Sequence, residues 1–477
     1  MSRRNKELPL LREVVVEDAG AEGKAVAKVD GLVVFVPFVV PGDVVDIQLY
    51  KKKKNYAEGR AVHFHRFSQL RVDACCPHFG ECGGCKWQTM KYEAQLDAKQ
   101  RQVRDALERL GQVDCTMMRP ICGSDNIYFY RNKLEFTFST RAWLPKSQLL
   151  ETEANGHTGA LGFHVPQFFD KVLPIEKCVL QADPSNDIRM AVGRYAMEHN
   201  LPFYDIRNHT GLLRNLVLRC SSLGDWMVIL IVASDDRELF FPLLEMLHAN
   251  FPQITSLQYI INTKFNDSYS DLEVHTYWGT PFIEEQMEAW CEHEGPLRFI
   301  INPKSFYQTN SPQARKLYGF VAELAELRPD DILYDLYTGT GTIALFLASQ
   351  VKRVVGIEYV EEAIADAHHN AERNGFTNTA FFAGDMAKVL TRQFVEENGR
   401  PDVVVTDPPR AGMHEAVVRQ LLDTAPRKIV YVSCNPATQA RDLKLLAERY
   451  DVKRIQPVDM FPHTHHVENV AELVRRD

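Results

Sequence analysis

The C-terminal part of the chain alternates short apolar runs with longer amphipathic stretches. Each unit opens with β-branched or other apolar residues and continues with a helical spacing of apolar positions. Strands that alternate with helices in this way predict an α/β domain with a parallel, doubly wound sheet, which we assign to residues 296–477. The units are ILYDLYTGTGTIALFLAS (332–349), VVGIEYVEEAIADAHHNAERNG (354–375), TAFFAGD (379–385), DVVVTDPPRAG (402–412) and KIVYVSCNPATQARDLKLLAERY (428–450).

The N-terminal and middle parts have other patterns. Residues 1–66 alternate apolar and polar positions, with Gly and Pro at the breaks, and predict a small barrel of about five strands. Residues 74–295 combine a cysteine cluster, a helix-like stretch at 91–111 and strand-like runs such as WMVILIVAS, which predicts a central α+β domain. Within this region, residues 91–124 could instead pack on the C-terminal domain.

Composition places the chain among ordinary soluble globular proteins. It has 477 residues, of which 45% are hydrophobic and 25% charged, so it should form about two to four domains. The start MSRRNKELPL has no apolar stretch behind it, and no window reaches the roughly 18 apolar residues of a membrane span. We therefore expect a cytoplasmic protein without a membrane partner and, since no feature indicates otherwise, a monomer. Ten cysteines are too sparse for a disulfide framework and favour reduced thiols, a metal site or catalysis.

One basic stretch stands out in a chain that is negatively charged as a whole. The net charge of −8 argues weakly against nucleic acid as a partner, but residues 51–71 carry seven Lys or Arg against one Glu. Such a run is most often a solvated loop. Interleaved rings such as Tyr56, Phe64 and Phe67 favour single-stranded nucleic acid instead, which needs cations for phosphates and rings for bases.

Acidic residues close successive strands of the predicted α/β sheet. Gly339 and Gly341 lie between the first strand and its helix, where they allow a tight turn and the close approach of a ligand. Glu358, Asp385 and Asp407 end the next three strands, at the edge where doubly wound sheets bind ligands. This series, with DPPR after the fourth strand, resembles the class I S-adenosylmethionine-dependent methyltransferases. The glycine string alone would also allow a nicotinamide dehydrogenase, but such an enzyme has no obvious use for DPPR.

A cysteine ends the fifth strand. Cys434 follows KIVYV and precedes Asn-Pro, so the strand would end there and present a thiol at the rim of the cofactor pocket. A lone cysteine after a strand is by default a small buried hydrophobe. Beside a methyl donor, however, a thiolate is what a carbon such as C5 of uracil requires, because addition at C6 makes C5 nucleophilic. A base must then remove the C5 proton, and Glu468 is the candidate.

Several segments resemble known RNA-modifying proteins. Residues 1–66, which contain VFVPFVVPGD, resemble a TRAM domain, an RNA-binding barrel of the OB type. Four further segments together resemble the RNA 5-methyluridine methyltransferase family, whose members act on 23S rRNA or on tRNA. These are FYQTNSPQA (306–314), DPPRAG (407–412), SCNPATQARD (433–442) and FPHTHHVE (461–468).

The family resemblance implies roles for individual residues. It implies that Cys434 is the nucleophile and Glu468 the base. The glycine loop departs from the family at 337–342, where Tyr-Thr-Gly-Thr-Gly-Thr replaces the frequent Phe-Cys-Gly-x-Gly-Asn. S-adenosylmethionine, or its border with uracil, is expected to be lined by Gln308, Tyr337, Thr342, Glu358, Asp385 and Asp407.

Three cysteines lie close together in CCPHFGECGGCKWQ. Cys76, Cys82 and Cys85 have a C-x5-C-x2-C spacing, and zinc and iron–sulfur clusters both accept thiolates, so the spacing leaves both open. The resemblance to the rRNA branch of the family implies a [4Fe-4S] cluster with Cys178 as the fourth ligand. Cys75 is a competitor for Cys76. The residues expected only to pack in the interior are Cys115, Cys122, Cys220 and Cys291.

The substrate follows from the proposed chemistry. A uracil ring inside a stacked helix cannot reach Cys434, so the target uridine must be unstacked or flipped out. The resemblance to the rRNA branch of the family implies methylation of a 23S rRNA uridine, and we expect RNA contacts from the barrel, from residues 51–71, and from Arg131 and Lys133. The alternatives are a tRNA T-loop uridine methyltransferase and a nonenzymatic RNA-binding iron–sulfur protein. Packing or RNA contact, rather than metal binding, is the preferred interpretation for His463, His465 and His466.

Overall fold

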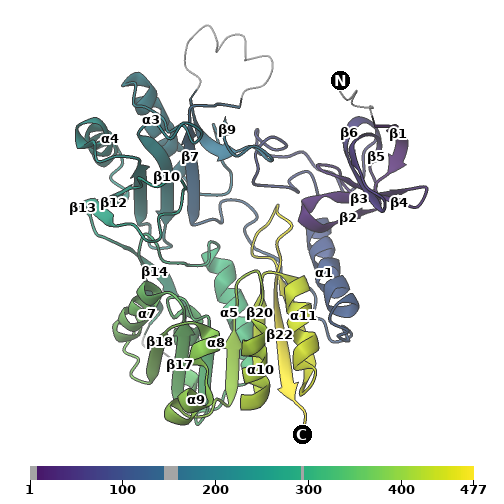
Figure 1. Ribbon diagram of the computed structural model, residues 1–477, viewed down its shortest axis with the longest axis vertical. Helices are drawn as coiled ribbons and strands as arrows, with labels where there is room; N and C mark the ends of the chain where they lie inside the picture. Colours follow the sequence, from purple (N-terminus) through teal and green to yellow (C-terminus); the bar gives the residue numbers. More distant parts are fainter. Residues whose placement is uncertain (1–7, 144–158, 292–294) are drawn as a thin grey trace.

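The computed structural model describes residues 8–143, 159–291 and 295–477. Figure 1 shows an N-terminal barrel, a central domain and a C-terminal α/β domain, with loops of all three meeting near the middle of the molecule. Residues 1–7 of the predicted barrel lie outside the described ranges. Within those ranges, every helix lacks the combination of length and apolar character that crossing a membrane requires.

The N-terminal sheet contains six strands in the order β1-β5-β6-β4-β3-β2, one more than the sequence predicted. Along β5, Val45, Ile47 and Leu49 are buried and face one core, as the period of two of a strand requires. The additional strand is the two-residue β2, too short to leave a pattern. The strands are β1 (Leu10–Val15), β2 (Asp18–Ala19), β3 (Ala25–Val29), β4 (Leu32–Val36), β5 (Val44–Lys52) and β6 (Tyr56–Arg66), and η1 spans Ala21–Gly23.

The central domain is built on a seven-stranded sheet in the order β13-β12-β11-β10-β7-β8-β9. Its strands β10 and β11 are buried on both faces. On one face Leu216 and Val228 pack with α3 and α4, and on the other Val217 and Met227 join the core of the C-terminal domain. The elements are β7 (Lys133–Ser139), β8 (Ala160–His164), β9 (Val172–Pro174), α3 (Ser185–Glu198), β10 (Leu213–Cys220), β11 (Trp226–Val232), α4 (Arg237–Asn250), β12 (Ile254–Ile261) and β13 (Val274–Gly279).

A two-stranded hairpin, β14 (Ile283–Met287) with β15 (Leu297–Ile301), links the central and C-terminal domains. It spans the boundary that the sequence pattern placed at residue 295. The domain boundaries therefore stay predictions, whereas the three sheets are features of the structure.

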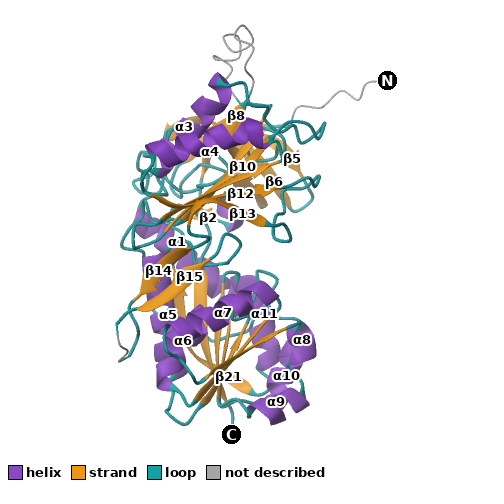
Figure 2. Ribbon diagram, turned by 90° about the vertical axis from the view of Figure 1, so that its left-hand side faces the viewer, coloured by secondary structure: helices purple, strands orange, loops and turns teal. Residues whose placement is uncertain are grey.

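The C-terminal domain confirms the predicted α/β class. Its sheet has the order β18-β17-β16-β19-β20-β22-β21, in which the first five strands are parallel and β22 is antiparallel to both neighbours. Figure 2 shows helices on both sides of this sheet. The strand order reverses between β16 and β19, which is where doubly wound sheets bind ligands.

The elements of this domain alternate along the chain. They are α5 (Ser311–Ala325), β16 (Ile332–Leu336), α6 (Thr342–Leu347), η2 (Ala348–Gln350), β17 (Arg353–Glu358), α7 (Glu361–Arg373), β18 (Thr379–Ala383), α8 (Met386–Val389), α9 (Arg392–Asn398), β19 (Val403–Thr406), α10 (Glu415–Thr424), β20 (Lys428–Ser433), α11 (Pro436–Leu446), β21 (Tyr450–Val458) and β22 (Glu468–Arg475).

Helix α1 (Tyr92–Arg109) lies beside α11 of the C-terminal domain. Its buried residues Val103 and Leu107 belong to the same apolar core as β20 and β21. The chain after α1 then runs along the outer strand of the sheet, where Met118 and Cys122 form parallel bridges with β21. Residues 91–124 thus pack on the C-terminal sheet.

Candidate active site

The carboxyl ends of the parallel strands bring the candidate residues to one edge of the sheet. A loop with Tyr337, Gly339 and Gly341 follows β16, and Cys434 follows β20. Because parallel strands end at the same edge, residues far apart in the sequence line one crevice. The acids at that edge are Glu358 at the end of β17, Asp385 after β18 and Asp407 after β19.

The loop after β16 leaves room for a ligand at one glycine. Tyr337, Gly339 and Gly341 all have positive φ, at 65°, 55° and 80°. A Cβ added to Gly339 would meet no atom within 4 Å, whereas one on Gly341 would lie 3.1 Å from Cβ of Ala367. Gly341 is therefore needed for packing against α7, while Gly339 faces open space. Its amide donates to Oε2 of Glu358 at 3.2 Å.

Two carboxyl groups, of the buried Asp335 and the partly buried Asp407, have raised pKa values in the crevice. Asp335 accepts from the Thr338 hydroxyl at 2.6 Å and from the Ala344 amide at 3.1 Å, and its second oxygen has no partner among the described residues. Burial raises the pKa of Asp335 to about 7 against these hydrogen bonds. Burial, together with the neighbouring Asp335, raises the pKa of Asp407 to about 7. A cationic ligand would favour both ionised forms, so the residues present suit a sulfonium compound.

Cys434 lies between β20 and α11. The next residue, Asn435, caps the helix by accepting from the Ala437 amide at 3.1 Å, and its side chain donates to the carbonyl oxygen of Arg410 at 3.0 Å. The loop after β19 is thereby fixed to the turn that carries the thiol. Burial, helped by the charges of Glu468 and Asp407, raises the pKa of Cys434 to about 11, and the guanidinium of Arg410 opposes this shift.

Glu468 opens β22, beside the strand that carries Cys434. It is 5% exposed, and the next residue, Asn469, pairs with Ser433. Burial and the charge of Asp407 hold the pKa of Glu468 well above its usual range, and Arg410 opposes them. The Cys434 thiol and the carboxyl groups of Glu468 and Asp407 interact electrostatically, so a change of charge at one of them alters the proton affinity of the others. At neutral pH the Cys434 thiol of the free protein is protonated.

The remaining cofactor candidates lie on a loop or at the start of a helix. Gln308 is buried in the loop before α5, and its carbonyl oxygen accepts from Nδ2 of Asn132 at 2.9 Å. Asp385 caps α8 by accepting from the Ala387 amide at 3.1 Å. The hydroxyl of Thr342 lies 3.3 Å from that of Tyr318. Gln308 is therefore positioned from the central domain as well as from its own.

Sequence reasoning missed the residue that anchors this loop. Arg219 on β10 is 3% exposed and donates to the carbonyl oxygens of Asn302 at 2.7 Å and Ser305 at 2.7 Å. Burial lowers the pKa of Arg219 to about 10. The available signal was an arginine inside the otherwise apolar run LVLRC of a strand buried on both faces.

The four cysteines proposed as ligands line a single cavity of about 1280 Å³, which Arg131, Lys133 and His466 also line. Cys75 is exposed and does not line it. Burial raises the pKa of Cys85 to about 12, and the charges of Cys178, Cys82 and Cys76 add to this effect. Across the described ranges, no three His, Cys, Asp or Glu side chains converge as ligands of one metal ion. A four-iron cluster is bound at separate iron atoms, so its thiolates need not converge on one point.

The other cysteines divide between interior and surface. Cys115 is buried, and Cys122 and Cys220 pack against apolar cores, as expected. Cys291 is exposed, so its prediction as a packing residue is wrong. It follows Trp290 in an otherwise polar stretch (EAWCEHEG), where burial has little apolar sequence to support it.

Some cations of the basic stretch 51–71 are already paired within the protein and are not free to bind a partner. The Arg71 guanidinium binds the buried carboxylate of Asp43 at 2.5 Å and lies 5.4 Å from the ring centre of Phe67. Lys51 pairs with Glu58. Phe67 is 64% exposed and offers its ring to solvent. This surface therefore offers an exposed ring for stacking a base beside its remaining cations.

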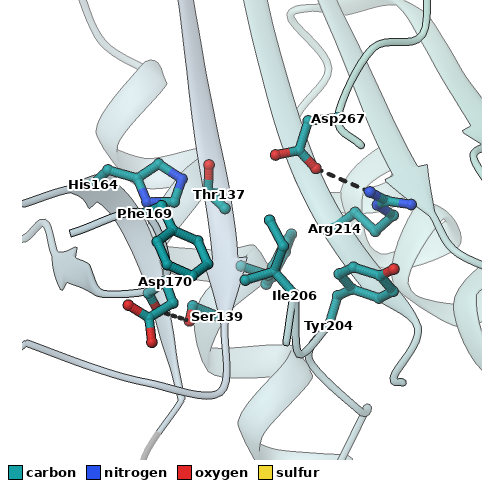
Figure 3. Close-up of a pocket in the computed structure, with 10 residues that line it drawn as sticks. Thr137, Ser139, His164, Phe169, Asp170, Tyr204, Ile206, Arg214 and Asp267 are labelled. Atoms are coloured by element: carbon teal, nitrogen blue, oxygen red, sulfur yellow. Dashed lines mark hydrogen bonds and ion pairs between the residues drawn. The ribbon is translucent and has the colours of Figure 1, made fainter. Parts of the chain in front are cut away.

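A pocket in the central domain does not compete as a ligand site. It lies between Ser139, Asp170, Arg214 and Asp267, and its volume is about 10 Å³ (Figure 3). Such a space holds about one water molecule. The Arg214 guanidinium is already bonded to Asp267 at 3.0 Å.

Comparison with known proteins finds two domain models and several relatives that match this chain. A family model described as tRNA (Uracil-5-)-methyltransferase matches residues 281–476, and a TRAM domain model matches residues 11–62. Proteins named uncharacterized RNA methyltransferase are similar over nearly the whole chain. The one from Bacteroides thetaiotaomicron is 54% identical over 96% of this chain and 100% of its own, and the one from Porphyromonas gingivalis is 52% identical over 96% and 99%.

A solved structure is similar over the same length. The crystal structure of Pyrococcus abyssi tRNA (uracil-54, C5)-methyltransferase in complex with S-adenosyl-L-homocysteine superimposes with a TM-score of 0.72 and 29% identity, covering 97% of this chain and 100% of that one. The relatives, the two domain models and the site geometry agree. The chain belongs to the RNA uracil-5-methyltransferase family, with a TRAM domain at its N-terminus.

Proposed function

We propose that this protein transfers a methyl group from S-adenosylmethionine to C5 of a uridine in RNA, with Cys434 as nucleophile and Glu468 as base. The observation that carries the proposal is the position of the Cys434 thiol between the acidic crevice and the buried Glu468, on adjacent strands. The similar Pyrococcus abyssi structure holds S-adenosyl-L-homocysteine, the product such a transfer would leave.

The first half of the reaction forms a covalent adduct. The Cys434 sulfur bonds to C6 of uracil, its proton leaves to solvent or to a neighbouring carboxylate, and the C5–C6 π electrons move to make C5 an enolate carbon. Arg410 and the N-terminus of α11 favour the thiolate. C5 then attacks the methyl carbon of the sulfonium, the C–S bond breaks, and its electrons remain on sulfur as a neutral thioether.

The second half releases the enzyme. The Glu468 carboxylate takes the proton from C5, the C5–C6 double bond reforms, and the bond from C6 to the Cys434 sulfur breaks to regenerate the thiolate. The raised pKa of Glu468 makes its ionised form a stronger base than an exposed carboxylate. Glu468 must be ionised when it takes this proton, so a proton bound to it in the free protein leaves to solvent before this step.

We assign the methyl donor to the crevice between β16 and β19. Gly339 allows its close approach, Glu358 suits its ribose, and Asp385 lies near where its adenine would lie. The other proposed contacts, with the donor or with its border to uracil, are Gln308, Tyr337, Gly341, Thr342 and Asp407.

The proposed substrate is 23S rRNA, with a tRNA T-loop uridine as the second candidate. The cysteine-lined cavity supports the first. The second is favoured by the Pyrococcus abyssi tRNA (uracil-54, C5)-methyltransferase, whose structure is similar over 97% of this chain. The test is to incubate the protein with labelled methyl donor and total RNA lacking the modification, and to map the product. Label at one uridine of 23S rRNA is expected, and label confined to tRNA would contradict it.

We also propose that Cys76, Cys82, Cys85 and Cys178 hold a [4Fe-4S] cluster. Four thiols that line one cavity and interact electrostatically fit such a group, which would hold the loop 76–88 against the central sheet. No electron is transferred in the methylation. Iron and sulfide analysis of anaerobically purified protein should find about four of each per chain. Stoichiometric zinc without iron would contradict the cluster.

A further inference from the structure

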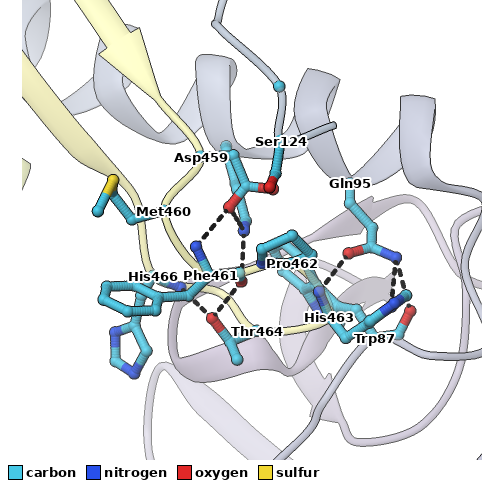
Figure 4. Close-up of polar contacts among 12 residues, drawn as sticks. Trp87, Gln95, Ser124, Asp459, Met460, Phe461, Pro462, His463, Thr464 and His466 are labelled. Carbon is cyan, nitrogen blue, oxygen red and sulfur yellow. Dashed lines mark hydrogen bonds and ion pairs between the residues drawn. The ribbon is translucent and has the colours of Figure 1, made fainter. Parts of the chain in front are cut away.

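The segment between β21 and β22, residues 459–467, leads directly to Glu468 and is held from several sides (Figure 4). We propose that Gln95 on helix α1 is a positioning residue for the release step. It holds this connection so that the Glu468 carboxylate reaches the C5 proton of the methylated adduct. The inference rests on the proposed role of Glu468.

Gln95 joins three pieces of chain by its side-chain amide alone. It is fully buried, and its Oε1 accepts from the backbone amide of His463 at 2.8 Å. Its Nε2 donates to the carbonyl oxygens of Trp87 at 3.0 Å and Met90 at 2.8 Å, and lies 3.2 Å from Nδ1 of His463. One side chain thereby fixes the connection both to α1 and to the chain that follows Cys85.

The same histidine is held from its other side. The carbonyl oxygen of His463 accepts from the amides of Lys86 at 2.8 Å and Trp87 at 3.0 Å, and the preceding carbonyl, of Pro462, accepts from the hydroxyl of Tyr130 at 3.0 Å. His463 also has φ of 65°, a left-handed conformation that a side chain rarely adopts. Such a backbone persists only where its surroundings hold it in place.

The start of the connection is anchored separately. The ammonium group of Lys99, also on α1, lies 2.5 Å from Oδ1 of Asp459 and donates to the carbonyl oxygen of Phe461 at 3.0 Å. The hydroxyl of Tyr92 donates to the other carboxylate oxygen of Asp459 at 2.8 Å. Removal of the Gln95 bonds would therefore loosen the middle of the connection, which the bonds from Lys86, Trp87 and Tyr130 hold only in part, without releasing its first residue.

The end of the connection reaches the site. His466 lies 3.1 Å from the guanidinium of Arg410, which interacts with both Cys434 and Glu468. Cys434 itself is held by other contacts, at the end of β20 and the start of α11. A shift of the connection should therefore move Glu468 and His466 more than the thiol. Proton removal from C5, rather than attack at C6, is the step that should slow.

The test follows the covalent protein–RNA species on denaturing gels, with labelled total RNA from cells lacking the modification and S-adenosylmethionine. In Gln95→Met, adduct release should fall by about 10- to 100-fold, as small misplacements of catalytic groups do, while adduct formation changes by less than about twofold. Tyr130→Phe, which removes only one hydroxyl bond to the connection, should give a smaller effect in the same direction.

A matched control separates positioning from general loss of stability. Gln258 is an equally buried glutamine whose amide bonds to Ser256 and Pro281 in the central domain. Gln258→Met should lower thermal stability without accumulating adduct. If Glu468→Gln accumulates adduct but Gln95→Met and Tyr130→Phe release it at the rate of Gln258→Met, the inference is overturned and the proposed function stands. If Glu468→Gln accumulates none, the base assignment fails and the inference fails with it.

Discussion

Ser433 on β20 pairs with Asn469 on the antiparallel strand β22, and this register brings Cys434 and Glu468 to the same end of two adjacent strands. The strand order is decisive, because β22 is inserted between β20 and β21 although β21 comes first in the chain. The proposed nucleophile and base thus arise from opposite chain directions at one sheet edge. Their backbone positions depend on the pairing of these two strands.

The raised pKa of Cys434 predicts how its reactivity depends on pH. Since that pKa is about 11, the thiol is mostly protonated at pH 8 and alkylation of the free protein should speed up as pH rises toward 11. Glu468→Gln removes one of the charges that raise it, so the pKa should fall and the rate of Cys434 alkylation at pH 8 should rise by about three- to tenfold. Peptide mapping after iodoacetamide measures this rate.

The exposed Cys291 serves as an internal control in the same digest. Its alkylation rate should be equal in the two proteins. An unchanged or slower rate at Cys434 in Glu468→Gln would show that the carboxyl group does not act on the thiol.

Gly339 offers a test of the cofactor crevice. Gly339→Ala places a methyl group in open space at a positive φ, which should cost about 1 kcal/mol of unfolding free energy and weaken S-adenosylmethionine binding by about tenfold or more. Gly375 has φ of 72° with the same open surroundings, but it lies after α7, away from the crevice. Calorimetry should find normal affinity in Gly375→Ala, and equal affinities in both variants would remove Gly339 from the binding site.

The buried pair Lys99 and Asp459 should be important for stability. Both side chains are fully buried, so Lys99→Met leaves an uncompensated carboxylate and should lower the unfolding free energy by about 3–5 kcal/mol in urea titrations. Arg109→Met breaks an exposed pair with Asp105 on the same helix and should cost less than about 1 kcal/mol. Similar losses for the two variants would argue that the buried pair has no special role.

Phe67 tests the RNA surface of the barrel. Phe67→Ala should weaken RNA binding by about 1–3 kcal/mol, the value of one base stacked on an aromatic ring, with little change in methyl-donor affinity. Phe265 is 72% exposed in the central domain and provides the matched substitution. If Phe265→Ala and Phe67→Ala bind RNA equally well in titrations at one salt concentration, the surface 51–71 is not part of the binding site.

The pattern of apolar and polar residues was sufficient to predict the fold of the C-terminal domain, because the local signals there agree with the strands and helices of the structure. Apolar runs mark β17, β19 and β20, and each leads to a candidate residue at the strand end, so one topological rule assembles Glu358, Asp407 and Cys434. Recognising these runs as parallel strands was enough to predict that the three residues lie at one edge of the sheet, without any knowledge of distances.

The remaining parts of the site depend on contacts that leave no local signal. Lys99 binds Asp459 across 360 residues, and Gln95 binds His463 across 368. Each of these polar side chains is common on helices and loops. Only tertiary packing makes them buried partners, so a pattern of neighbouring residues could not reveal the connection that leads to Glu468.

A covalent bond between Cys434 and the uracil ring is the central claim, and trapping it with RNA that contains 5-fluorouridine tests it most directly. Fluorine at C5 cannot be removed as a proton, so the adduct should persist after methyl transfer. Mass spectrometry of the digested protein should find the methylated nucleotide on the peptide that contains Cys434, and none in Cys434→Ala, which should also have lost turnover. An adduct on another residue, or normal turnover by Cys434→Ala, would contradict the account.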